Sequence, residues 1–225
     1  MQLPAYWLPR PEFRLDAATL ERLEALYQAS IAPGTGDWVA ELPVPAWQFL
    51  CWLTDCKNHL LHGTGDPSIT LFEPRQSNDV NEFGNRKAVY AASDGIWPMF
   101  FAVIDRTKYH MGIINAAIEL ELPGGSRTPP YYYFSMTDYV LVQEPWREGA
   151  IYVLPRDPFE EEAPRELDGV RVHGNHWASL SPVKPLAKIR IQPQDFPFLW
   201  QIRPHDQERV WQRAEADPGG FPWLD

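Results

Sequence analysis

The chain has 225 residues, of which 44% are hydrophobic and 22% are charged, a composition typical of a folded globular protein and not of a disordered one. Its formal net charge of −10 at pH 7 argues against binding to duplex nucleic acid, because phosphate backbones attract basic surfaces. No apolar stretch approaches the roughly 18 residues of a membrane helix, and the first residues lack the apolar core of a signal peptide. We therefore expect a cytoplasmic protein with no membrane partner.

The N-terminal part of the chain, residues 1–58, is expected to form an extended arm followed by two helices. Asp16 suits the N-cap of a helix over residues 16–30, in which leucines recur on one face. Pro45 suits the first turn of a second helix over residues 46–58. Large apolar side chains cover nearly all sides of this second helix, which predicts deep packing.

The central stretch alternates apolar runs with turns. Residues 59–62 read as a short buried strand that ends in the glycine-rich turn 63–67. A second strand is expected over residues 88–92. It runs into an aromatic helix that Ser93 or Asp94 can cap.

The second half of the chain is rich in apolar and aromatic runs that predict strands. These strands are expected over residues 111–122, 131–136, 139–142, 150–154 and 186–191. The acidic segment from Pro155 to Asp168 is expected to be an exposed excursion, and a short helix is expected near 205–216. Strands that follow a helical start indicate an α+β protein, which we expect to be one domain over residues 1–225. Its parts would be the arm and helices (1–58), a sheet-containing core (59–200) and a C-terminal helix and tail (201–225).

One set of residues in the central stretch carries a family resemblance. His62, Gly63 and Thr64 close the first strand, Tyr90 lies on the next, and a helix rich in Ala, Phe and Met follows. This order resembles the NAD-binding half of the ADP-ribosyltransferase fold, in the His-Tyr-Glu branch that includes diphtheria toxin and the poly-ADP-ribose polymerases. The resemblance covers about a fifth of the chain. It implies a mixed, strongly twisted, split β-sheet preceded by N-terminal helices.

The resemblance also assigns roles to these residues. In that family the His contacts the adenosine-side ribose, the Gly offers backbone hydrogen bonds to the nicotinamide carboxamide, and the Tyr stacks on the nicotinamide ring. These roles fall on His62, Gly63 and Tyr90, and Thr64 belongs to the same expected cofactor site. An aromatic face suits a flat cationic ring, which agrees with the assignment of NAD as substrate.

The family's third motif is a Glu near the start of a later strand, where a preplaced carboxylate stabilises the positive charge that develops on the ribose. Glu148, just ahead of the strand expected over 150–154, is the best positional match and the expected catalytic residue. Glu144 is the second candidate, and Glu160 to Glu162 are the third.

The leading hypothesis is therefore an NAD-binding ADP-ribosyltransferase or NAD glycohydrolase that cleaves the nicotinamide–ribose bond. Its partner would be a small-molecule nucleotide, and the sequence does not identify the acceptor of ADP-ribose. The alternative is a non-catalytic ligand- or protein-binding domain on the same scaffold. A third and weaker interpretation is a metal-dependent hydrolase built from four histidines, namely His59, His62, His173 and His176.

Overall fold

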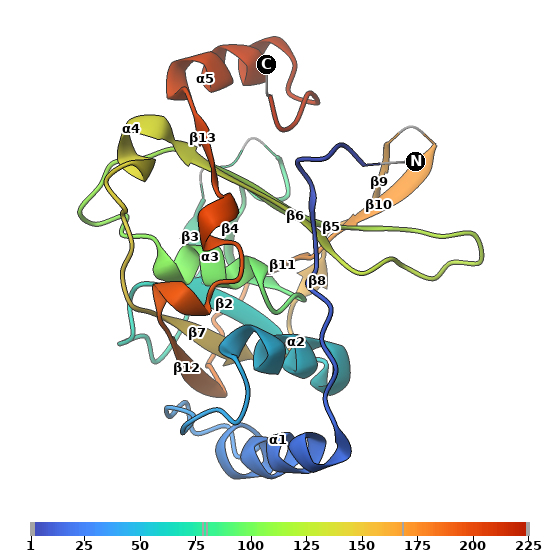
Figure 1. Cartoon of the computed structure of the whole chain (residues 1–225), viewed down its shortest axis with the longest axis vertical. Coiled ribbons are helices and arrows are strands. Elements are labelled where there is room, and N and C mark those ends of the chain that lie inside the picture. Colours follow the sequence, from blue (N-terminus) through green and yellow to red (C-terminus); the bar gives the residue numbers. More distant parts are fainter. Residues whose placement is uncertain (1–2, 78, 80, 168, 224–225) are drawn as a thin grey trace.

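The computed structural model describes residues 3–77, 79, 81–167 and 169–223 (Figure 1). Within these residues the helices are α1 (Ala17–Ser30), α2 (Ala46–Lys57), α3 (Trp97–Val103), α4 (Asp138–Leu141) and α5 (Gln207–Ala216). The strands are β1 (Leu8–Pro9), β2 (Leu60–Thr64), β3 (Arg75–Gln76), β4 (Lys87–Ala92), β5 (Ile113–Leu120), β6 (Tyr131–Thr137), β7 (Gly149–Leu154), β8 (Glu160–Glu161), β9 (Arg165–Leu167), β10 (Val170–Gly174), β11 (His176–Ser179), β12 (Ala187–Ile191) and β13 (Arg203–His205).

The described strands form two sheets. One has the order β12-β7-β2-β4-β11-β8, with β3 beside β4. The other has the order β1-β6-β5-β10-β9, with β13 beside β6. Neighbouring strands are antiparallel except for the β6–β13 pair, which is parallel. The expectation of an α+β protein is thus confirmed, and the strands divide into two sheets.

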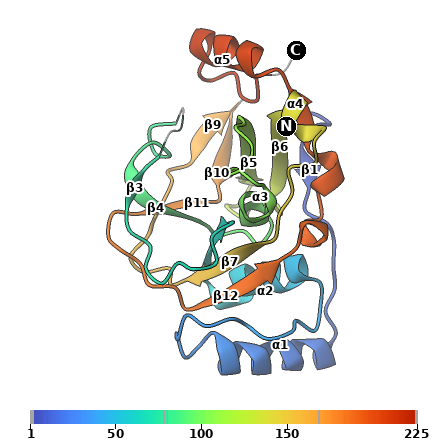
Figure 2. The same cartoon turned by 90° about the vertical axis from the view of Figure 1, so that its left-hand side faces the viewer.

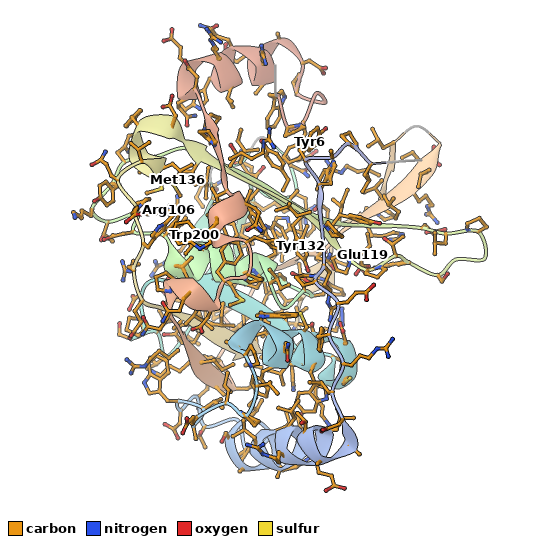
Figure 3. All side chains as sticks on the ribbon, in the orientation of Figure 1. Tyr6, Arg106, Glu119, Tyr132, Met136 and Trp200 are labelled. Carbon is orange, nitrogen blue, oxygen red and sulfur yellow. The ribbon has the colours of Figure 1, made fainter. Side chains whose placement is uncertain are left out.

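Helix α3 lies between the two sheets (Figure 2). Its Phe100 packs against Phe134 of β6, with 5.0 Å between the ring centroids, while the backbone of Pro98 rests against Gly63 of β2. Tyr132, labelled near the centre of Figure 3, is fully buried in the same core cluster. The main core therefore surrounds α3 between the sheets and extends to α1 and α2.

The N-terminal helices form as predicted. The carboxylate of Asp16 accepts a hydrogen bond from the backbone N–H of Thr19 at 2.8 Å, as an N-cap does. Phe49, Leu50 and Leu53 of α2 are fully buried, in agreement with the expected deep packing. Helix α1 lies on the outer side of α2 (Figure 1).

Two expectations were wrong. Residues 139–142 were expected to form a strand, but the chain leaves β6 after Thr137 and turns into the short helix α4. A four-residue apolar run has too little periodicity to separate helix from strand. The segment from Pro155 was expected to be exposed, but part of it pairs with β11 as β8, and Glu162 is only 8% exposed. Its last residue, Asp168, lies outside the described residues.

Among the described residues, no helix combines the length and apolar character needed to cross a membrane.

Candidate functional site

The three segments that carry the predicted motifs are neighbouring strands. Strand β2, which carries His62, Gly63 and Thr64, lies between β4, which carries Tyr90, and β7, which Glu148 immediately precedes. The register of β2 with β7 runs from Leu60↔Leu154 to Thr64↔Ala150. These segments are up to about 90 residues apart in the chain, and the sheet brings them side by side.

Strands β2 and β4 pair over a much shorter length. Leu61↔Ala92 is the pair that joins them among the described residues. Beyond this pair, toward Gly63 and Tyr90, the two backbones no longer form a ladder. The sheet therefore separates at the position of the His-Gly-Thr triplet.

His62 links the two strands where their pairing ends. Its Nδ1 lies 2.7 Å from the carbonyl oxygen of Tyr90, so Nδ1 carries the proton and donates it to that acceptor. Its ring packs against Phe72, with 4.7 Å between centroids. Burial lowers the pKa of His62, and the bond to the Tyr90 carbonyl opposes this shift only in part. The neutral imidazole is thus favoured at this position.

Gly63 lets helix α3 approach the sheet. A Cβ on Gly63 would lie 1.7 Å from the carbonyl oxygen of Pro98, and a Cβ on Gly149 would lie 2.0 Å from that of Ala102. Both distances are far below contact, so only glycine fits under α3 on β2 and β7. The packing of α3 accounts for these glycines, and the expected role of Gly63 in binding a carboxamide remains a prediction.

Thr64 ends β2 and shapes the following turn, because its hydroxyl accepts a hydrogen bond from the N–H of Asp66 at 3.1 Å. The structure gives Thr64 this local role, and its expected role at a cofactor site remains a prediction.

Tyr90 is held at both ends of its side chain. Its hydroxyl donates to the carbonyl oxygen of Phe83 at 2.8 Å and accepts from the N–H of Arg86 at 2.8 Å. Its ring is stacked on His176, with 4.9 Å between centroids and 29° between planes. Tyr90 therefore presents a rigid ring whose one face is covered by an imidazole.

The side chains of His62 and Tyr90 lie on opposite faces of their sheet. Leu61 is paired with Ala92, so these two point to the same face. Because side chains alternate along a strand, Tyr90 shares that face and His62 points to the other. Their ring partners agree, since His62 contacts Phe72 and Tyr90 contacts His176. The two rings do not line a single pocket in this structure.

Glu148 lies beside β12. Its Oε1 is 2.6 Å from Nη1 of Arg190, its Oε2 accepts from the amide of Gln192, and its side chain is 43% exposed. His62 is paired with Tyr152 of β7, and Glu148 lies four residues before Tyr152. An extended chain of this length spans about 13 Å, so Glu148 is that far from the level of His62. Strand alternation places Glu148 on the face of His62 and away from that of Tyr90.

The other candidate carboxylates are spread over the surface. Glu144 has a φ of 48° and an exposed side chain in the turn after α4. Glu160 pairs with Arg86, and Glu161 lies 3.1 Å from Arg127.

Glu162 is different, because it is buried next to the ring that covers Tyr90. Its Oε2 lies 3.4 Å from Nδ1 of His176, and its Oε1 accepts from the amide of Asn81 at 2.5 Å. Burial alone would raise the pKa of Glu162, but the His176 hydrogen bond and charge, with the Asn81 amide, outweigh it and lower the pKa. Of the predicted carboxylates, Glu162 is thus the buried one, and it contacts the imidazole that is stacked on Tyr90.

Sequence reasoning missed Asn115 and Asn175, two polar residues near the stacked rings of Tyr90 and His176. Ser93 Oγ donates to Oδ1 of Asn175 at 3.1 Å, and Nε1 of Trp97 donates to Oδ1 of Asn115 at 2.7 Å. The amide nitrogen of Asn175 is buried and has no hydrogen-bond partner among the described residues. Asn115 comes from the other sheet, and no local pattern marks such a residue.

Two shallow depressions on the described surface show how the predicted site residues relate to its hollows. One of about 410 Å³ is lined by Glu73, Pro74, Lys87, Leu180 and Pro182. The other, of about 420 Å³, lies between the N-terminal arm and the segment that contains the exposed Trp200 (Figure 3). Neither depression is lined by the predicted site residues.

The four histidines of the metal hypothesis do not converge. His59 Nε2 lies 3.0 Å from the Tyr27 hydroxyl, and His173 Nε2 lies 2.9 Å from Glu121. In the part of the chain that the structure describes, no group of three or more His, Cys, Asp or Glu side chains is arranged to hold a metal ion.

Comparison with protein-family models, with curated proteins and with solved structures finds no significant match for this chain.

Proposed function

We propose that this protein binds NAD and cleaves its nicotinamide–ribose bond, passing ADP-ribose to an acceptor or to water. The observation that carries the proposal is the strand order β4-β2-β7, which places the Tyr90, His62-Gly63 and Glu148 segments side by side. A split between two of these strands is what the resemblance to the ADP-ribosyltransferase fold implies, and β2 and β4 separate beyond Leu61↔Ala92.

Each residue then has a role that its surroundings permit. Gly63 lies beyond the last pair of described residues that joins β2 and β4, so its backbone forms no ladder with β4. A carboxamide can hydrogen-bond to the backbone of Gly63 there. Tyr90 offers a fixed ring for stacking. Glu148 is the electrostatic catalyst, which supports positive charge on the ribose as nicotinamide leaves. Its ion pair with Arg190 is about half exposed and is therefore weak, so little free energy is lost when the carboxylate leaves Arg190.

The test is nicotinamide release measured together with NAD binding by calorimetry. Glu148→Gln should bind NAD as the wild type does but release nicotinamide about 100-fold more slowly, because one stabilising group in a transition state is worth about 10² to 10³ in rate. Glu144→Gln is the matched control, since Glu144 is a nearby exposed carboxylate, and it should behave as the wild type. Absence of both binding and release at millimolar NAD would overturn the proposal.

A specific observation favours the second candidate, a non-catalytic ligand- or protein-binding domain. His62 and Tyr90 face opposite sides of the sheet, and Glu148 is turned toward Arg190. In the same assay, wild-type protein that binds NAD without releasing nicotinamide would establish this alternative.

A further inference from the structure

The ring of His176 sits in a box of aromatic side chains. It is stacked on Tyr90, with 4.9 Å between centroids, and two other rings meet it edge-on. These are Phe83 at 5.3 Å and 71°, and Trp97 at 5.5 Å and 74°. The carboxylate of Glu162 completes the box, 3.4 Å from Nδ1 of His176.

This combination suits one class of ligand. An aromatic face attracts a flat cation, edge-on rings fix the plane of a bound ring, and a buried carboxylate stabilises positive charge. The pyridinium ring of NAD has this chemistry. In the structure the chain's own imidazole occupies the box.

A second ring does not fit while His176 is in place. A centroid separation of 4.9 Å is a direct contact between Tyr90 and His176, with no space for an intervening ring. His176 is attached to β11, whose backbone is paired with Ala92 of β4 and with the Glu162 segment. A rotation of the side chain can therefore empty the box without breaking the sheet.

We propose that His176 is a gate that occupies the nicotinamide position on Tyr90 and must swing away before NAD binds. This inference rests on the proposed function and adds a regulation of the same site. Glu162 and Asn81 hold the gate closed, because the Asn81 amide fixes the carboxylate that His176 contacts. Only molecules with an open gate can then bind nicotinamide. The apparent affinity is therefore the intrinsic affinity multiplied by the fraction of molecules in which the gate is open.

The gate is tested with two substitutions at one position. His176→Ala removes the ring and should bind NAD and free nicotinamide about 3- to 10-fold more tightly than the wild type, the range that corresponds to one lost stacking contact. His176→Phe keeps a ring on Tyr90 and should show no such gain. Thermal unfolding of both variants verifies that they are folded.

A direct measurement follows the gate in the wild-type protein. The imidazole protons of His176 should have NMR shifts displaced by the ring current of Tyr90. Addition of nicotinamide should return them toward the values of an unstacked histidine. If nicotinamide binds and these shifts do not change, the gate is overturned even if His176→Ala fails to fold.

The outcomes separate the gate from the proposed function. If the wild type binds NAD and His176→Ala binds it equally or less tightly, the gate is overturned and the proposed function stands. If neither protein binds NAD or nicotinamide, both are overturned. An equal gain in His176→Phe would also overturn the gate, because it would show that an occupying ring is not the obstacle.

Discussion

Nδ1 of His62 lies 2.7 Å from the carbonyl oxygen of Tyr90, so a side chain of β2 holds the backbone of β4 where the two strands stop pairing. This bond replaces a ladder hydrogen bond at the point of separation. The edge of the split is thus fixed by a partly buried imidazole, and protonation of its Nε2 would place a charge where the surroundings disfavour it.

Acid should weaken the fold through His62. Burial lowers its folded-state pKa below the ordinary value of 6.5, so the unfolded chain takes up a proton first as the pH falls. The contribution of neutral His62 to the free energy of unfolding is therefore fully present above about pH 6.5. It is lost as the pH falls from there through the lower folded-state pKa. Urea unfolding at pH 7.5 and pH 5.5 measures the effect, to which His59 and His205, whose pKa values are also lowered by burial, contribute.

The variant His62→Asn isolates the contribution of His62 to this pH dependence of stability. The Asn amide can donate to the Tyr90 carbonyl from a position close to that of Nδ1 and does not titrate. We expect a smaller loss of stability between the two pH values in this variant. An unchanged loss would show that His62 is not a source of the pH dependence.

Gly63→Ala should destabilise the protein severely. The new methyl group would lie 1.7 Å from the backbone carbonyl of Pro98, and a helix backbone cannot yield as a flexible side chain can. We expect a loss of about 3 kcal/mol in the free energy of unfolding. The matched control is Gly65→Ala, in which the methyl group meets the flexible Arg147 side chain, with an expected loss below about 1 kcal/mol. Equal losses in the two variants would contradict the role of Gly63 in seating α3.

Asp94 joins helix α3 to the second sheet. Its Oδ1 accepts from the N–H groups of Ile96 and Trp97, and its Oδ2 accepts from the Tyr132 hydroxyl at 2.6 Å. Asp94→Ala leaves these buried donors without an acceptor and should cost about 2–4 kcal/mol in urea unfolding. Asp94→Asn retains an acceptor for the two N–H groups and should stay within about 1 kcal/mol of the wild type, helped by the removal of a carboxyl whose pKa burial raises. A large loss in the Asn variant would show that the negative charge itself is required.

The local pattern of the sequence determined several elements correctly. Asp16 caps α1, the first two turns of α2 are mostly buried, and the apolar runs at β2, β4 and β7 are strands. The N-cap position of α3 is Ile96 and not Ser93 or Asp94, but the Asp94 carboxylate accepts from the N–H groups of Ile96 and Trp97 at the start of this helix. Caps and alternation act over a few residues, so they can be recognised without knowing the fold.

Other features required the tertiary structure. Residues 138–141 form the helix α4, where a strand was expected. Glu162 is buried because its segment pairs with β11. Neither outcome is encoded in the residues nearby. The burial of Glu162 depends on the edge of β11, a distant strand with which its segment pairs.

The candidate site shows the same division. From short patterns and a resemblance, the sequence predicted that the segments of His62, Tyr90 and Glu148 belong to one site, and this remains a prediction. Only the tertiary structure decided that β2 lies between β4 and β7, that His62 and Tyr90 face opposite sides of the sheet, and that His176 covers Tyr90. The reason is that a side chain's face is set by pairing register, and a shift of one residue between strands distant in sequence reverses it.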